Sequence, residues 1–173
     1  MLKRKNSQIW VETVVYILIG LAIIGLLLSI IKPEIEKRKD KLLIEKSLEM
    51  LDFLKNKIED IIYYGPGNSR TIEITIKKGL LNINGEEDKI EFSMESSYLY
   101  SEINKSITQG GINIKTSKKG NHYVVSLVLN YSDVNITWDN KDIEHVLQKS
   151  SAPHKLLIMN KGETGDIIQI DFS

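Results

Sequence analysis

A single carboxylate, Glu12, interrupts the most apolar part of the chain. It is preceded by Gln8 and by three basic residues, Lys3, Arg4 and Lys5. A charged side chain at the centre of a lone membrane helix costs about 2.5–3.5 kcal/mol, and less near the membrane surface. The simplest explanation is a residue in the first helical turn, where the helix dipole favours an acid. The alternative is a carboxylate that pairs with a positive charge when helices associate.

Residues suited to bond-making chemistry are scattered in this sequence. The chain has no cysteine, which excludes a disulfide framework, a thiolate zinc site and a cysteine nucleophile. The histidines, His122, His145 and His154, have no metal-ligand spacing to one another, and we expect them to be exposed to solvent. No nucleophile elbow, zinc-protease helix or phosphate-binding loop is present in the sequence. We therefore expect a protein that is not an enzyme, with no metal and no cofactor.

Three Asn-x-Ser/Thr sequences are candidate N-glycosylation sites, at Asn104, Asn130 and Asn135. All three follow the apolar segment in the chain. They are compatible with glycosylation at a cell surface, and chance matches are also expected in a chain rich in asparagine.

Length and charge narrow the class of protein further. The chain has 173 residues, the size of one domain with an appendage. Lys plus Arg number 23 and Asp plus Glu number 23, so no strong positive field recruits nucleic acid. We therefore expect no nucleic-acid partner.

The residues from Val14 to Ile31, VVYILIGLAIIGLLLSII, carry no charge. As a helix they span roughly 27 Å, close to the ~30 Å hydrocarbon core of a bilayer. A cleaved secretory signal normally has a shorter apolar region with small residues at the cut, whereas KPEIEKRKDK follows here. A retained membrane helix is the better interpretation. Basic residues flank both of its ends, so the positive-inside rule does not decide its orientation.

Residues 34–64 are predicted to continue as an amphipathic helix. Apolar residues recur there at spacings of three, four and seven, namely Ile44, Leu48, Leu51, Leu54, Ile58, Ile61 and Ile62. Pro33 is tolerated as a kink between the two halves. The breaker Gly65-Pro66-Gly67-Asn68 predicts the end of the helix.

After Arg70 the apolar pattern changes to a period of two, which is typical of strands. Asn84-Gly85 predicts a hairpin between strands at 80–84 and 90–94, and Gly120 marks a turn between strands at 112–118 and 123–129. Further strands are predicted at 71–77, 136–138, 156–158 and 168–172, the last of them paired. The whole pattern predicts an α+β fold. A long N-terminal helix, transmembrane in its first half and amphipathic in its second, packs on a C-terminal antiparallel β-sheet or sandwich head domain.

The N-terminal sequence KRKNSQIWVETVVYILIG resembles the class III signal peptide of archaeal-type type IV pilin-like proteins, the prepilin family. In that family a membrane aspartic peptidase cuts before the apolar helix, which stays on the mature protein. The mature chain often begins with Gln and carries Glu at its fifth position. The resemblance implies cleavage between Ser7 and Gln8, which makes Glu12 the fifth mature residue. Ser7 stands where Gly or Ala is usual.

The resemblance also implies a division of the chain. Residues 1–7 form a leader peptide, in which Lys3, Arg4 and Lys5 are the cytoplasmic patch that the peptidase recognises. Residues 8–32 form the transmembrane and filament-core helix, and residues 33–64 continue it. Residues 65–173 form the antiparallel β head domain.

Cleavage before Gln8 creates a positively charged α-amino group near lipid. Glu12 can neutralise it in the same chain or in a neighbouring subunit. Pairing inside a helical bundle relieves the cost of the carboxylate and fixes the axial register of the helices. The resemblance thus assigns Gln8 and Glu12 to filament assembly.

The leading hypothesis is a type IV pilin-like structural subunit of a cell-surface filament. The chain inserts in the membrane with a cytoplasmic N-terminus and is processed by a prepilin peptidase. An assembly ATPase and a platform membrane protein then assemble it with copies of itself or other pilins, and the head is exposed for adhesion or surface contact. The alternative is a single-pass membrane protein that does not polymerise and whose extracytoplasmic β-domain binds a ligand or partner.

Overall fold

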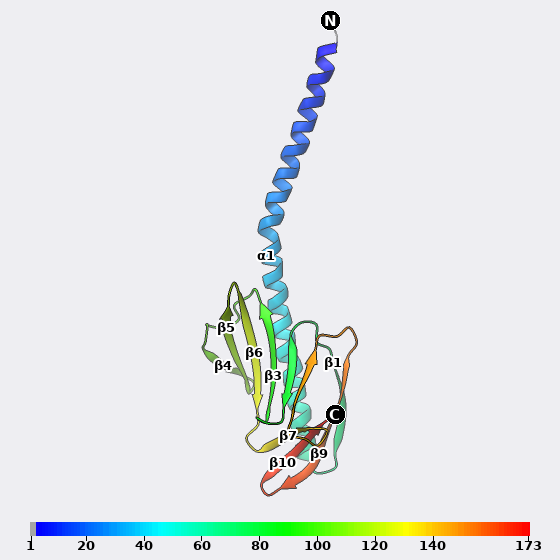
Figure 1. Cartoon of the computed structure of the whole chain (residues 1–173), viewed down its shortest axis with the longest axis vertical. Helices are drawn as coiled ribbons and strands as arrows, with labels where there is room; N and C mark the ends of the chain where they lie inside the picture. The colour runs from blue at the N-terminus through cyan, green and yellow to red at the C-terminus, as the bar shows by residue number, and fades with distance from the viewer. Residues whose placement is uncertain (1–2) are drawn as a thin grey trace. The chain divides into compact units, whose positions relative to one another are not determined.

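The computed structural model describes residues 3–173, with side chains from Trp10 onward. Helix α1 (Lys3–Tyr64) comes first and ten strands follow it within these residues, which confirms the predicted α+β fold (Figure 1). Contacts divide the chain into two units, Met1–Lys39 and Asp40–Ser173. We call them the N-terminal unit and the head unit. The head unit therefore includes the last part of α1 as well as the strands.

The strands form two sheets. The four-stranded sheet has the order β1-β9-β10-β7 and comprises β1 (Ser69–Ile74), β7 (Val134–Trp138), β9 (His154–Thr164) and β10 (Ile167–Phe172). The six-stranded sheet has the order β4-β5-β6-β3-β2-β8 and comprises β2 (Leu80–Asn84), β3 (Lys89–Ser96), β4 (Ser106–Gln109), β5 (Ile112–Lys119), β6 (His122–Asn130) and β8 (Glu144–Gln148). The strand pairs are antiparallel except β10 with β7, which is parallel.

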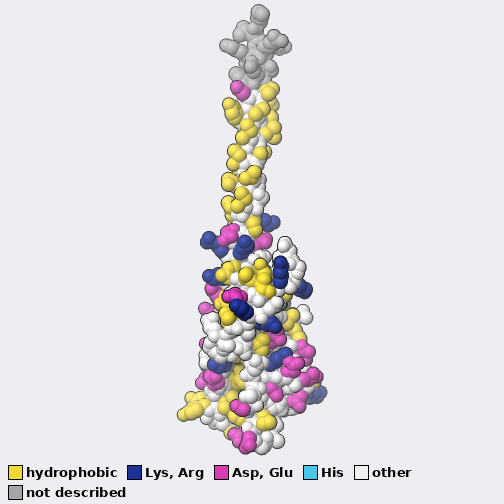
Figure 2. Space-filling view, turned by 90° about the vertical axis from the view of Figure 1, so that its left-hand side faces the viewer, with side chains coloured by type: hydrophobic (Ala, Val, Ile, Leu, Met, Phe, Trp, Pro, Cys, Tyr) yellow, Lys and Arg dark blue, Asp and Glu magenta, His cyan; other side chains and the backbone are white. Residues whose placement is uncertain are grey.

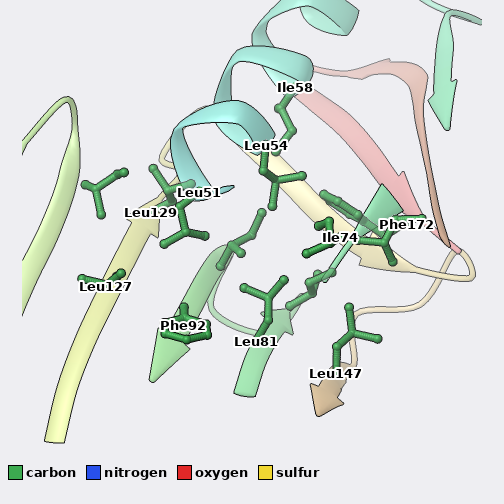
Figure 3. Packing of buried hydrophobic residues seen from close by; sticks show 14 of the residues in the cluster. Leu51, Leu54, Ile58, Ile74, Leu81, Phe92, Leu127, Leu129, Leu147 and Phe172 are labelled. Atoms are coloured by element: carbon green, nitrogen blue, oxygen red, sulfur yellow. The ribbon is translucent and has the colours of Figure 1, made fainter. Parts of the chain in front are cut away.

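Residues 40–64 of α1 bury one face in the core of the head unit. This segment is rich in Leu, Lys and Glu, which are good helix formers. The buried positions are those predicted from the spacing, Ile44, Leu48, Leu51, Leu54, Ile58 and Ile61, whereas Ile62 is half-buried. They pack with strand residues of both sheets in a single cluster (Figure 3). The prediction of an amphipathic helix packed on the β-structure is therefore confirmed.

The helix ends where the sequence predicts, because residues 65–68 close its last turn. Gly65 adopts a positive φ of 84°, which favours glycine, and its N–H donates to the carbonyl of Ile62 at 3.1 Å. The Asn68 side chain donates to the carbonyl of Tyr64 at 2.8 Å. From β9, the buried Asn160 side chain donates to the carbonyl of Ile61 at 3.4 Å. The end of α1 is thus bonded directly to the four-stranded sheet.

Both predicted hairpins are present, β2 with β3 and β5 with β6. The first has a longer turn than the Asn84-Gly85 dipeptide suggested, since residues 85–88 separate the strands. Strands β4 and β8 were not predicted. All four residues of β4 are exposed, and in β8 Leu147 is the single buried residue, so neither strand shows a full alternation of apolar and polar side chains.

Candidate functional site: the apolar half of the helix

The N-terminal unit presents apolar side chains on all sides of α1. Ile17, Leu18 and Ile19 point about 100° apart around a helix, and their exposed fractions are 57%, 59% and 50%. Within the described residues, an 18-residue window of this helix has a mean hydropathy of 3.0 and no part of it is buried. Figure 2 shows the resulting column of hydrophobic side chains. By length and composition, α1 can cross a membrane, and a helix that is apolar all round requires apolar surroundings.

Glu12 is an exposed carboxylate in the interior of this helix. Because α1 begins at Lys3, Glu12 lies nine residues after the first helical residue. The influence of the helix dipole falls off within the first turn. In the uncut chain, Glu12 therefore lies beyond the first helical turn, and the helix dipole stabilises its carboxylate little.

The other residues of the predicted processing and assembly site lie at the very start of α1. The backbone of Lys3, Arg4, Lys5, Ser7 and Gln8 is helical. Their side chains lie outside the part of the chain whose side chains are described. Their predicted roles remain predictions.

A buried carboxylate that the sequence did not single out, Asp40, lies at the first residue of the head unit. It accepts a hydrogen bond from the Lys78 ammonium at 2.5 Å and one from the Ser97 backbone N–H at 2.7 Å. Lys78 and Ser97 belong to the loops that follow β1 and β3, so the pair ties α1 to both. In the sequence Asp40 stands among alternating charges, where a solvated acid is the ordinary expectation.

The histidines differ from one another in exposure. His122 is exposed, as predicted. His145 and His154 are half-buried, so the expectation of exposure is wrong for both. The ring of His145 stacks on Trp138 with centroids 3.5 Å apart, and His154 Nε2 lies 2.8 Å from the carbonyl of Gln148. The His145 ring thus packs on an aromatic side chain, and the His154 ring forms a hydrogen bond with the backbone.

The described residues contain no group of three or more His, Cys, Asp or Glu side chains placed to hold a metal ion. At the start of β3, a lysine lies beside two carboxylates. Lys89 forms ion pairs with Glu87 and, at 3.9 Å, with Glu91. Its hydrogen bond to Glu87 raises the pKa of the Lys89 ammonium, although burial opposes this. The Lys89 ammonium thus supplies the positive charge beside these two carboxylates.

An acidic groove of about 490 Å³ runs between α1 and the β4–β5 turn. Glu45, Glu49 and Asp52 line its helix side, with Leu48, Tyr100 and Ile112 among the remaining lining residues. Burial raises the pKa of the Tyr100 hydroxyl, and the negative charge of Glu45 raises it further. The groove is therefore unfavourable for anions.

Comparison of the chain with protein-family models, curated proteins and solved structures finds no match. The function must therefore be argued from the residues themselves. The chain combines a long, apolar N-terminal helix with a β-rich unit. This architecture is compatible with a pilin-like subunit and with a single-pass membrane protein.

Proposed function

We propose that this chain is a type IV pilin-like subunit of a cell-surface filament. In this proposal a prepilin peptidase cuts between Ser7 and Gln8, and the apolar half of α1 then packs against the same segment of other subunits. The head unit is exposed at the filament surface for adhesion or surface contact. The protein acts through assembly and has no enzymatic role.

The observation that carries the proposal is the combination of Glu12 with a fully exposed apolar helix. Side chains around residues 10–31 have no cover in the single chain, so lipid or other helices must supply it. Lipid covers the apolar side chains well and the Glu12 carboxylate poorly. Neighbouring helices can cover both, provided that one of them carries a positive charge at the right height.

Cleavage before Gln8 supplies that charge. The new α-ammonium lies four residues before Glu12, and residues four apart lie on the same helix face. An intrachain pair relieves part of the cost in the membrane. An interchain pair relieves it in the assembled state and sets the axial offset of adjacent helices, which favours one register over sliding.

The head unit supports the proposal because the second half of α1 is part of its core. Residues 44–61 supply six side chains of its core. The helix therefore cannot leave the head unit without exposing that core. A subunit held by its apolar half in a helical bundle carries its head unit with it.

The test is the N-terminal sequence of the chain recovered from cell membranes. The proposal predicts a first residue of Gln8. Ser7→Gly, which is small, should be cut like the wild type, whereas Ser7→Phe should accumulate uncut because the bulky side chain does not fit a small-residue site. An intact Met1 in the wild type would refute processing.

The second candidate is a single-pass membrane protein whose head unit binds a ligand without polymerisation. The exposed apolar helix favours it equally, because one such helix suffices to anchor a protein. It predicts an intact N-terminus and no surface filaments.

A further inference from the structure

We infer that Asn104 accepts an N-linked glycan on the folded head unit, and that this glycan covers the open edge strand β4. The inference requires an extracytoplasmic head unit and therefore rests on that part of the proposed function. It arises because the structure places the three Asn-x-Ser/Thr sequences in very different surroundings.

Asn104 lies in the exposed loop between β3 and β4. Its backbone N–H donates to the carbonyl of Thr116 at 2.8 Å, so the loop is anchored while the side chain is exposed. Within residues 10–173, the Asn104 side chain has no hydrogen-bond partner, and Ser106 is exposed as well. Both the acceptor nitrogen and the hydroxyl that defines the motif are thus accessible.

The Asn135 sequence is the opposite case, because it lies inside strand β7. Asn135 is half-buried and Ile136 is 1% exposed. The Thr137 hydroxyl is buried and donates to the Asp171 carboxylate at 2.6 Å. The motif requires a Ser or Thr hydroxyl at its third position. In the folded chain this hydroxyl is buried, so a glycosylating enzyme cannot contact it.

Asn130 and Ser132 are exposed, but Tyr131 between them packs against the core, whereas Lys105 between Asn104 and Ser106 is exposed. The Tyr131 N–H donates to the carbonyl of Asp88 at 3.0 Å, and the Tyr131 ring packs against the core. The packed ring restricts the conformations that the Asn130 sequence can adopt when an enzyme binds it. Asn104 is therefore the site best suited to reaction after folding.

The position of Asn104 also gives the glycan a role. Strand β4 is a free edge of the six-stranded sheet, and all four of its residues are exposed (Figure 1). Two large apolar residues flank the acceptor, Ile103 at 41% exposure and Ile107 at 45%. A free edge strand presents unpaired backbone N–H and C=O groups that can pair with another chain, and exposed apolar side chains beside it favour such pairing. A hydrophilic glycan at Asn104 would be attached one residue after Ile103 and three residues before Ile107.

The attachment is a group transfer with a polyisoprenyl-phosphate-linked sugar as co-reactant. The Asn104 Nδ2 forms a bond to the anomeric carbon of the sugar and gives up one proton. The bond from that carbon to the phosphate oxygen breaks, and the electron pair leaves with the lipid phosphate. No oxidant or reductant is involved.

The first test is mass spectrometry of the full chain isolated from its own cells, with surface protease digestion to locate the head unit. We expect a sugar mass on the peptide that contains Asn104 and unmodified peptides at Asn135. Because Asn104 has a φ of 60°, Ser106 is the better position for variants, since a substitution there leaves the acceptor conformation intact. Ser106→Ala should lose the sugar mass and Ser106→Thr should keep it.

An unmodified Asn104 on a head unit that protease digests from outside would overturn the inference while leaving the proposed filament untouched. A head unit that is protected from outside would refute the extracytoplasmic position itself.

The second test is light scattering in detergent. Ser106→Ala should shift to higher mean mass than Ser106→Thr, and Ile107→Lys in the Ser106→Ala chain should reverse the shift. Equal masses for the two Ser106 variants would refute the covering role.

Discussion

The two halves of α1 have the same secondary structure and opposite surfaces. In residues 10–31 apolar side chains are exposed on all sides of the helix, whereas in the head unit Leu51 and Leu54 are fully buried and Asp52 and Phe53 between them are exposed. The second half obtains its cover from the β-sheets of its own chain. Residues 10–31 have no such cover within the described part of the chain. The comparison teaches that one continuous helix can bury one segment within its own chain and leave another segment to be covered from outside.

The largest effect is expected in the exposed half, from Glu12→Ala. If Glu12 pairs with the α-ammonium of a neighbouring subunit, the variant should be inserted and cut normally but should form few or no filaments. Electron microscopy of the sheared surface fraction measures this. Glu36→Ala, in the charged segment after the apolar run, is the matched control and should assemble. Normal filaments from Glu12→Ala would contradict the role of Glu12 in assembly.

In the packed half, Leu51→Ala should lower the free energy of unfolding of the head unit by about 2–5 kcal/mol, because it leaves a cavity in the core. Leu27→Ala, in the exposed half, should change it by less than about 0.5 kcal/mol. Urea unfolding of the full chain in detergent, followed by Trp138 fluorescence in a Trp10→Phe background, measures both. Equal losses would show that the apolar half also packs on the head unit.

At the junction of the halves, Asp40→Ala should lower the free energy of unfolding by about 1–3 kcal/mol. The Ser97 N–H and the Lys78 ammonium lose their acceptor, and the partial exposure of Lys78 keeps the cost below that of a fully buried pair. Asp40→Asn should retain part of the stability, since its amide oxygen still accepts from Ser97. A variant of Asp40 as stable as the wild type would show that the pair does not hold the helix.

The smallest effect is expected from Tyr131→Phe. The Tyr131 hydroxyl is buried and has no hydrogen-bond partner within residues 10–173. Its removal should therefore leave the stability unchanged or raise it by up to about 1 kcal/mol. Chemical denaturation of the two chains at neutral pH measures this difference.

The same variant should alter the dependence of stability on alkaline pH. Burial, with a further contribution from the charge of Glu59, raises the pKa of the Tyr131 hydroxyl above its usual value. The unfolded chain then loses this proton above a pH of about 10 while the folded chain keeps it. The wild type therefore loses stability as the pH rises through this range, and Tyr131→Phe should lose less. Parallel pH profiles would contradict the burial of the hydroxyl.

Much of the fold could be predicted from the sequence because its signals are local. The spacing of Ile44, Leu48 and Leu51 specifies a helix face, and the dipeptide Asn84-Gly85 marks a hairpin. Strands β4 and β8 were missed because they lie at sheet edges, where side chains on both faces are largely exposed and no alternation is needed. The parallel pairing of β10 with β7 depends on chain topology, which periodicity does not specify.

The candidate site was only partly predictable. The apolar run and Glu12 stand out in the sequence because each is unusual for its surroundings. Asp40 does not, since its burial depends on Lys78 and Ser97, which are far away in the chain. The stacking of His145 on Trp138 likewise joins strands of different sheets. Contacts between residues far apart in the chain, or between two sheets, leave no mark in local composition.

The most direct test of the proposed function is electron microscopy of the sheared surface fraction, with mass spectrometry of the chains it contains. We predict filaments that contain this chain with Gln8 as its first residue and with the β-rich head unit intact. A chain that remains in the membrane fraction with Met1 intact, while the sheared fraction contains none of it, would contradict the proposal.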